Sequence, residues 1–322
     1  MPSKRKRYFK RLILGVLASL IISSQARAFD KKESIALSRY IIAEMYAQLG
    51  ETSSAIQEYK SALKADYQNA AIHLGLATTF FKDNQVDKAA EELNLAIKFD
   101  PDAVEPHAIL ALLYFSQNKV SLANAEYETA LKKAIDIQPE NADIYKNLGL
   151  LYLRQKKFKE AEGIYRLVLN ISSQDAQVYF YLANISDELK NRAEAVKNLK
   201  KALELKPDYS PALNYLGYLY VEEGKNLDEA GDMIRRALEI EPDNGAYVDS
   251  LGWFYFKKGK TKEAIKELEK ASGLMPDPVI YDHLGDAYFK INDLEKAKIN
   301  WQKSLEMDNA QEKIKKKIEG IK

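Results

Sequence analysis

The stretch that decides the fold is Val248-Asp249-Ser250-Leu251-Gly252-Trp253-Phe254-Tyr255, followed by Ala264, Leu268, Ala271 and Pro276. Its small residues Gly252 and Ala264 are twelve positions apart. Two antiparallel helices approach closely only where both carry small side chains, and large side chains such as Tyr255 fill the remaining space. Proline ends the second helix because it cannot donate a backbone hydrogen bond. The stretch therefore predicts a pair of antiparallel helices.

The same spacing of small residues recurs along the chain. The pairs are Ala43 and Ala55, Ala77 and Ala89, Ala111 and Ala123, Gly149 and Ala161, Ala183 and Ala195, Gly217 and Ala230, Gly252 and Ala264, and Gly285 and Ala297. All are twelve apart except the Gly217 pair, which is thirteen apart. Three residues after the first member stands an aromatic residue, replaced by Ser186 in the fifth unit. One helix pair cannot bury its own apolar face, so eight such units predict a stacked array.

The pattern resembles the tetratricopeptide repeat (TPR), with the seventh unit as the best match. The fourth unit is nearly as good, with Tyr145, Leu148, Gly149, Tyr152, Ala161 and Tyr165. The resemblance implies an all-α fold, a right-handed superhelical solenoid of about eight helix-turn-helix repeats over residues 29–309. The predicted repeats are 36–69, 70–103, 104–141, 142–175, 176–209, 210–244, 245–277 and 278–309.

Residues 310–322 are basic and place Ile314, Ile318 and Ile321 on one helical face. We expect a C-terminal capping helix that covers the last repeat, because terminal repeats need a polar outer face. A basic amphipathic membrane anchor is the alternative.

Residues 1–28 have the order of a secretory signal peptide. The basic residues are Lys4, Arg5, Lys6, Arg7, Lys10 and Arg11, and the apolar run 12–22 leads to Ala26-Arg27-Ala28. That run is shorter than the ~20 apolar residues of a membrane span, and no later segment is apolar enough to span. We expect residues 29–322 to be periplasmic or secreted in a bacterium. Tethering to the inner membrane by an uncleaved N-terminal anchor is the alternative.

Composition excludes several classes of function. Removing the seven basic residues of the leader from the total of 48 leaves 41 against 47 acidic residues, so the body is mildly acidic. Nucleic acid binding needs clustered Lys and Arg, which this body lacks. The chain has no cysteine, which excludes disulfides, thiolate metal sites and a lipid-modified cysteine after the leader.

The TPR resemblance places candidate binding residues on the concave wall formed by the first helices. They are Phe180, Asn184, Asn214, Tyr218, Asp249, Trp253, Phe256, Asp282, Asp286 and Phe289. Aromatic faces offer contact area, while acids and amides orient a ligand. A protein or peptide with Lys or Arg side chains would suit this wall. In the alternative interpretation, Trp253 and Phe256 pack against the next repeat and the acids are solvated.

No catalytic, metal or cofactor site is expected. The three histidines, His73, His107 and His283, share no metal-ligand spacing, and the chain lacks a nucleophile elbow and a phosphate loop. His283 follows Asp282 directly, and adjacent helix residues point about 100° apart, so these two cannot pair well. A remote alternative is a hydrolase that uses Asp249, Asp282 and Asp286, which would need carboxyl groups with separated pKa values.

These features together favour a non-catalytic, exported scaffold. It would hold a partner protein or peptide in cell-envelope assembly, secretion or polysaccharide export. The alternative is a carbohydrate-binding or enzyme-regulating module whose aromatic side chains stack on sugar rings.

Overall fold

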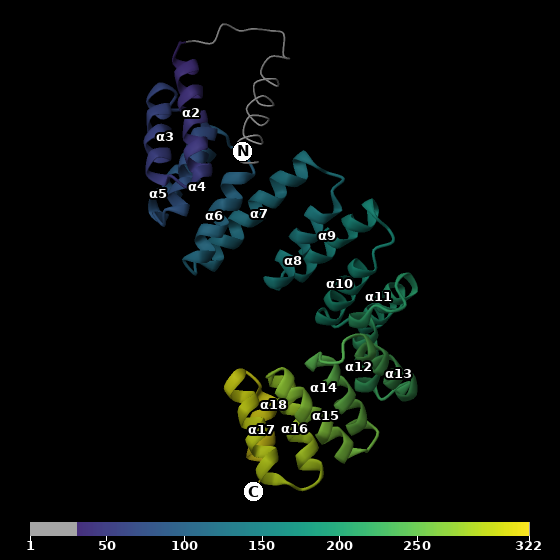
Figure 1. The fold of residues 1–322 in the computed structure, drawn as a ribbon. Helices are drawn as coiled ribbons and strands as arrows, with labels where there is room; N and C mark the ends of the chain where they lie inside the picture. The colour runs from purple at the N-terminus through teal and green to yellow at the C-terminus, as the bar shows by residue number, and fades with distance from the viewer. Residues whose placement is uncertain (1–30, 322) are drawn as a thin grey trace, which may run out of the picture. The chain divides into compact units, whose positions relative to one another are not determined.

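The computed structural model describes residues 31–321, and every regular element in this part of the chain is an α-helix. The predicted signal peptide lies outside the described residues. Helices form pairs joined by short turns, and a single helix follows the last pair (Figure 1). The helices are α2 (Lys31–Leu49), α3 (Thr52–Ala65), α4 (Ala70–Lys82), α5 (Val86–Phe99), α6 (Glu105–Ser116), α7 (Val120–Ile137), α8 (Ala142–Arg154), α9 (Phe158–Ile171), α10 (Ala176–Glu188), α11 (Arg192–Leu205), α12 (Ser210–Glu223), α13 (Leu227–Ile240), α14 (Gly245–Lys257), α15 (Thr261–Leu274), α16 (Pro278–Lys290), α17 (Leu294–Met307) and α18 (Glu312–Glu319).

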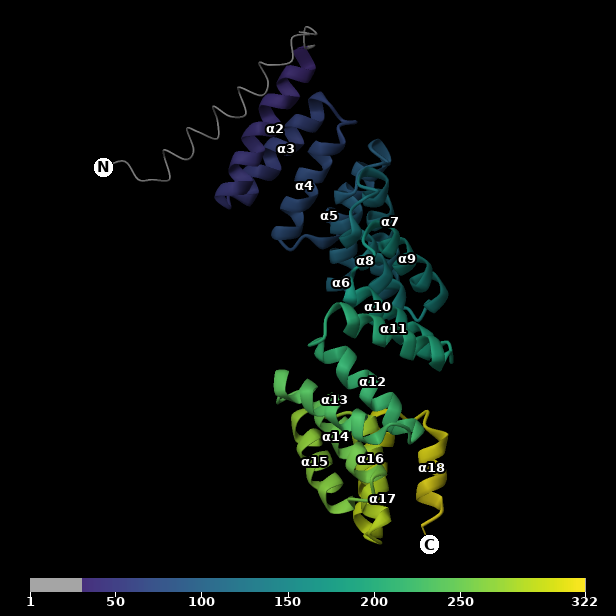
Figure 2. The same cartoon turned by 90° about the vertical axis from the view of Figure 1, so that its right-hand side faces the viewer.

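The chain divides into two compact units between Pro139 and Glu140. The first unit holds the helix pairs from α2 to α7, and the second holds the pairs from α8 to α17 followed by α18. Within each unit, the two helices of a pair lie side by side (Figures 1 and 2). The predicted all-α repeat fold of about eight helix pairs is confirmed.

A common hydrogen-bonded turn joins the two helices of a pair. In the seventh repeat the Lys260 N–H donates to the Tyr255 carbonyl at 2.9 Å, and in the eighth the Asp293 N–H donates to the Tyr288 carbonyl at 3.0 Å. The residue before each donor has a positive φ, as at Gly259, with φ of 75°. This is the geometry of a Schellman helix end, in which glycine adopts the left-handed conformation without a steric cost.

The sixth repeat explains the one spacing of thirteen. Gly224 ends α12 with a φ of 64°, and the Lys225 N–H donates to the Tyr220 carbonyl at 3.0 Å, as in the other turns. Asn226 then adds a residue with a φ of 49° before α13 begins. The additional residue lies in the turn, so the packing of the two helices keeps its register.

Small residues allow the paired helices to touch. A Cβ atom at Gly252 of α14 would lie 2.7 Å from the Leu268 side chain of α15, and one at Gly149 of α8 would lie 2.7 Å from Tyr165 of α9. Ala264, the small residue on the opposing helix of the seventh pair, is fully buried. The close crossing that the sequence predicts is therefore present, with large side chains lying directly on the glycines.

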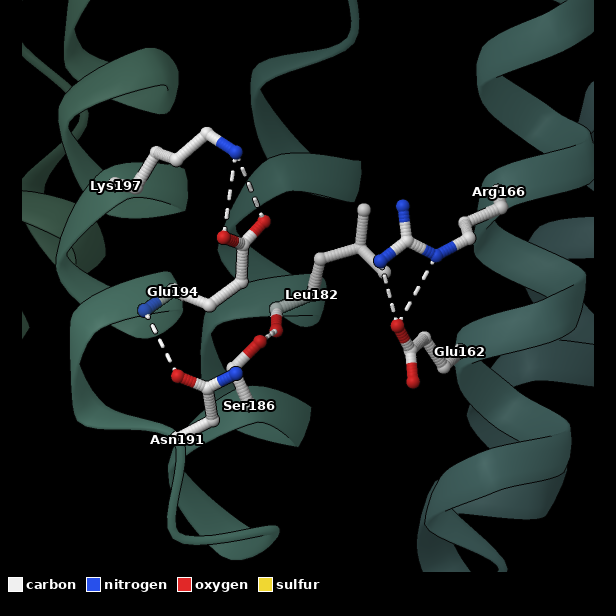
Figure 3. Close-up of polar contacts among 7 residues, drawn as sticks. All are labelled: Glu162, Arg166, Leu182, Ser186, Asn191, Glu194 and Lys197. Carbon is white, nitrogen blue, oxygen red and sulfur yellow. Dashed lines mark hydrogen bonds and ion pairs between the residues drawn. The ribbon is translucent and has the colours of Figure 1, made fainter.

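The fifth repeat accommodates Ser186 at its aromatic position without losing its helix. The Ser186 hydroxyl donates to the Leu182 carbonyl at 2.7 Å, one turn earlier on α10 (Figure 3). At the start of α11, the Asn191 side chain accepts a hydrogen bond from the Glu194 N–H at 3.3 Å. Because local backbone groups satisfy the serine, this departure from the repeat pattern stays local.

The last helix, α18, is a cap, as the sequence predicts. Ile314 is 2% exposed and belongs to the apolar cluster that contains Trp301, and Ile318 and Ile321 pack against the same cluster. An amphipathic membrane anchor would need this face to be free, and here it covers the eighth repeat. None of the helices within residues 31–321 combines the length and apolar character needed to cross a bilayer.

Candidate functional site

All ten predicted binding residues lie in the second unit, on the first helices of consecutive pairs. Phe180 and Asn184 lie on α10, Asn214 and Tyr218 on α12, Asp249, Trp253 and Phe256 on α14, and Asp282, Asp286 and Phe289 on α16. Their contacts divide them into three groups, which follow one another along the chain.

The group on α10 and α12 is engaged mainly in packing. The Phe180 ring lies 5.6 Å from the Tyr209 ring and 6.3 Å from the Tyr215 ring, measured between centroids. The Asn184 amide donates to the Phe180 carbonyl of its own helix at 2.8 Å. Asn214 differs, because its buried Oδ1 has no hydrogen-bond partner among the described residues. Of these three predicted residues, Asn214 is the one with a buried side-chain atom that lacks a hydrogen-bond partner among the described residues.

The central group on α14 is closed around His283. The His283 Nδ1 atom lies 3.0 Å from Asp249 Oδ1 and 3.2 Å from Oδ2, and both side chains are buried. The Trp253 indole stacks on the His283 ring at 4.0 Å and on the Phe256 ring at 4.7 Å, between centroids. Trp253 is only 7% exposed. Trp253 therefore packs on His283 of the next repeat, and Asp249 is ion-paired rather than solvated.

The electrostatics of this group favour the charged pair. Burial of His283 opposes its protonation, but the charge and hydrogen bond of Asp249, with smaller contributions from the charges of Asp282 and Glu222, together raise the pKa of the imidazole above its usual value. The Trp253 indole N–H donates to Glu222 Oε1 at 2.5 Å. Burial also raises the pKa of Tyr218, whose ring centroid lies 6.5 Å from that of His283. The indole of Trp253 and the imidazole of His283 thus each have a carboxylate partner.

Sequence reasoning missed His283 and Glu222 as members of this network. It compared His283 only with its neighbour Asp282, and the actual partner Asp249 lies 34 residues earlier. The seventh repeat, 245–277, has 33 residues, so His283 lies one position beyond the residue equivalent to Asp249 on the neighbouring first helix. A contact between residues about one repeat apart was the available signal.

The third group, on α16, holds a lysine from the cap. Lys317 Nζ of α18 lies 2.6 Å from Asp282 Oδ1 and 2.6 Å from Asp286 Oδ1. Asp286 also accepts a hydrogen bond from the Trp301 indole at 3.1 Å. Burial raises the pKa of Asp286, although the hydrogen bond from Lys317 acts in the opposite direction. Two of the predicted carboxylates of the wall are therefore occupied by an ammonium group of this chain.

A cleft of about 430 Å³ lies beside this ion pair, between α14, α16, α17 and α18. Its apolar lining comes from Phe256, Phe289 and Trp301. Phe289 is 51% exposed, and its ring centroid lies 5.6 Å from that of Trp301. The cleft is the place where predicted binding residues of the second unit meet around an open volume.

The arrangement offers little to the hydrolase alternative. Asp249 is bound to an imidazole, and Asp282 and Asp286 share one ammonium group. A general acid and base need carboxyl groups directed at a common reacting atom. Within residues 31–321, no three His, Asp or Glu side chains gather closely enough to hold a metal ion.

Comparison with curated proteins finds partial matches. The chain is 31% identical over 100 residues to the human protein named Protein O-mannosyl-transferase TMTC3, which covers 31% of this chain and 11% of that protein. It is 44% identical over 48 residues to the Caenorhabditis elegans protein named Protein O-mannosyl-transferase F38B6.6, covering 15% of this chain and 7% of the other. The chain thus spans about a tenth of the length of the curated relatives it matches.

Comparison with solved structures finds the same architecture. The APC/C hetero-tetramer Cut9–Hcn1 aligns with 96% of this chain and 58% of the other at a TM-score of 0.59, with 15% identity. A thermophilic TPR protein from Thermus thermophilus aligns over 55% of this chain and 97% of its own, at a TM-score of 0.48 and 21% identity. The first alignment supports the fold alone.

The family comparison covers most of the sequence. Residues 23–246 match the family described as the cilia and flagella-associated protein 70 C-terminal domain, and residues 249–278 and 279–311 each match a tetratricopeptide repeat. The repeats identified from spacing and packing are thus tetratricopeptide repeats. The chain belongs to the family of the cilia and flagella-associated protein 70 C-terminal domain, a family of tetratricopeptide-repeat proteins.

Proposed function

We propose that this chain is a non-catalytic scaffold that binds a partner protein through the first-helix side chains of its second unit. The partner would belong to an envelope complex concerned with assembly, secretion or polysaccharide export. Residues 1–28, with their basic, apolar and small-residue segments, support an exported location. Repeat arrays of this kind generally mediate protein–protein interaction.

One observation carries the proposal. On α14 and α16, Asp249 contacts His283, and Asp282 and Asp286 share Lys317 of α18. These carboxylates and the stacked aromatic rings are engaged with one another, instead of converging on a point where a substrate atom could react. Rigid aromatic surface flanked by polar groups is typical of binding sites, because it gives contact area at a low entropic cost. The open part of this surface is the cleft beside Phe289.

Two further points concern a cationic ligand and transferase activity. A ligand Lys or Arg would have to displace His283 from Asp249, or Lys317 from Asp282 and Asp286, so the groove offers a cationic partner no unoccupied acid at these positions. Transferase activity is named for relatives many times longer than the part that matches this chain.

The test is co-purification from a bacterial envelope fraction with the tagged full chain. Phe289→Ala is preferable to a Trp253 variant, because Phe289 is half exposed while Trp253 is part of the packing. A matched control is Ile299→Ala, which removes exposed apolar surface from α17 outside the cleft. We expect at least one envelope protein to be enriched with the wild type and the control, and depleted about tenfold with Phe289→Ala, as for an interface anchor worth ~1.4 kcal/mol.

Absence of an enriched protein, or equal enrichment with Phe289→Ala, would contradict this assignment of the binding surface. Enrichment of polysaccharide without protein would support the carbohydrate-binding alternative instead, with Phe289 as the stacking residue.

The exported location makes a separate prediction. Removal of residues 1–28 would leave a chain that begins at Phe29. Intact mass spectrometry of the chain from a fractionated bacterial host should find this shortened form in the periplasm or medium. A full-length mass in the membrane fraction would support the N-terminal anchor, and a full-length mass in the cytoplasm would refute export.

A further inference from the structure

The cleft at the C-terminal end has an apolar floor large enough for one side chain of a partner. Phe256, Phe289 and Trp301 come from three different helices and surround a volume of about 430 Å³. Trp301 is 1% exposed and its indole N–H is held by Asp286, so this ring is fixed. Phe289 packs on this fixed ring and is 51% exposed, so an aromatic side chain of a partner would gain contact area on Phe289.

The carboxylates beside the cleft are already engaged by a lysine of this chain. Lys317 lies between Asp282 and Asp286 at 2.6 Å from each, and its ammonium group also lies 5.6 Å from the centre of the Trp301 ring. This group of three charges leaves no unoccupied carboxylate to receive a cation. A ligand with Lys or Arg would therefore compete with a lysine tethered to the same repeat.

The rim of the cleft is positively charged. Lys290 at the end of α16 and Lys316 on α18 both line it, and both are exposed. Neither makes an ion pair with any carboxylate in the described part of the chain, in contrast to Lys315, which pairs with Glu312 at 2.6 Å. Two unpaired ammonium groups above an apolar floor attract a carboxylate and repel a cation.

We propose that this cleft binds a segment of a partner protein in which an aromatic side chain is flanked on both sides by acidic residues. The aromatic side chain lies against the exposed Phe289 ring, which itself packs on Trp301, and the flanking carboxylates pair with Lys290 and Lys316. This inference rests on the proposed function, because it names the kind of partner segment that a scaffold of this type would hold. It also makes α18 part of the binding site, in addition to its role as a cap.

Three labelled peptides test the proposal against the full chain by fluorescence anisotropy. They are Glu-Glu-Phe-Glu-Glu, Glu-Glu-Ala-Glu-Glu and Lys-Lys-Phe-Lys-Lys. We expect the first to bind with a Kd below about 1 mM, and both others to bind at least about tenfold more weakly. Raising the salt concentration should weaken the binding of the first peptide, because salt screens the charges of the rim lysines.

Two double variants with the same change of charge locate the site. Lys290→Glu with Lys316→Glu should lower the affinity for the acidic Phe peptide at least about tenfold. Lys298→Glu with Lys313→Glu changes exposed lysines on α17 and α18 that do not line the cleft, and should leave affinity within about twofold. Lys317 is left intact because it holds Asp282 and Asp286.

The outcomes separate this inference from the proposed function. Equal effects of the two double variants, tighter binding of the Lys peptide, or no binding of the acidic Phe peptide would overturn the inference. If Phe289-dependent co-purification still succeeded, the scaffold function would stand with a different partner chemistry. If the peptide bound as expected but no envelope protein co-purified, the cleft would stand and the envelope role would fail.

Discussion

Replacing Gly285 with Val is expected to destabilise the last repeats by about 3 kcal/mol, at the upper end of the range for overpacked sites. A Cβ atom at Gly285 of α16 would lie 2.4 Å from Cδ1 and Nε1 of Trp301 on α17, a separation that real Cβ contacts essentially never show. The indole cannot move aside easily, because it is almost fully buried and donates a hydrogen bond to Asp286. The helices of the eighth pair must therefore separate.

A matched control isolates this steric effect. Gly273 also lies within a helix, α15, but a Cβ atom there would meet nothing within 4 Å. Gly273→Val carries the same change in helix propensity, which favours Val over Gly by a few tenths of a kcal/mol, without the contact. It should leave stability unchanged or slightly increased.

The measurement is urea unfolding followed by tryptophan emission. The chain has two tryptophans, and both, Trp253 on α14 and Trp301 on α17, report on the last two repeats. Gly285→Val should shift the midpoint to lower urea, while Gly273→Val should not. Coincident unfolding curves for the two variants would show that the glycine is not needed for close approach of the helices.

The fold could be predicted for the same reason that this variant is expected to be destabilised, namely the close contact of the two helices at small residues. Whether two helices of a pair can touch depends on small residues such as Gly285 and Ala297 at a fixed spacing, which is a local property of the sequence. The additional residue of the sixth repeat was also visible as a spacing of thirteen, and the structure assigns it to Asn226 in the turn. Local pattern was therefore sufficient for the helix pairs and the cap.

The site was less predictable, because its contacts join residues one repeat apart. The TPR resemblance placed Asp249, Trp253 and Asp286 on first helices, where they lie, but it could not determine which neighbouring side chain each would meet. The imidazole of His283 and the ammonium group of Lys317 bind the acids that the sequence suggested for a ligand. The contact of Lys317 with Asp282 and Asp286 depends on the orientation of α18. The three isoleucines specify only which face of that helix is buried.

The same interrepeat contacts make the second unit sensitive to Asp249. Asp249→Ala leaves His283 buried without its ionic partner, and breaking a buried pair from one side typically costs about 3 kcal/mol or more. We therefore expect the free energy of unfolding to fall by that amount at pH 6. The measurement is again urea unfolding monitored by tryptophan emission. Asp232→Ala, which removes an exposed carboxylate paired with Arg235 on α13, should change stability by less than about 0.5 kcal/mol.

The stability lost in Asp249→Ala should depend on pH, and the titration of His283 decides whether it grows or shrinks as pH rises. Because Asp249 raises the pKa of His283 in the folded state, the stability from this pair is fully present below the unfolded pKa, which is about 6.5. It decreases as pH rises through the higher folded pKa. The difference between wild type and Asp249→Ala should therefore be largest near pH 6 and smaller near pH 9.

Tryptophan emission also separates this effect from a similar one elsewhere in the chain. The pKa of His73 in the first unit is raised as well. Burial of His73 lowers its pKa, but the hydrogen bond from its ring to Glu92, together with smaller contributions from other nearby groups, outweighs that effect. That pair contributes with the same sign, but no tryptophan lies in the first unit. A pH-independent loss in Asp249→Ala would mean that His283 stays neutral and serves only as a hydrogen-bond donor. A pH-dependent loss would show that a buried charge pair between consecutive repeats stabilises the wall on which the proposed binding surface is built.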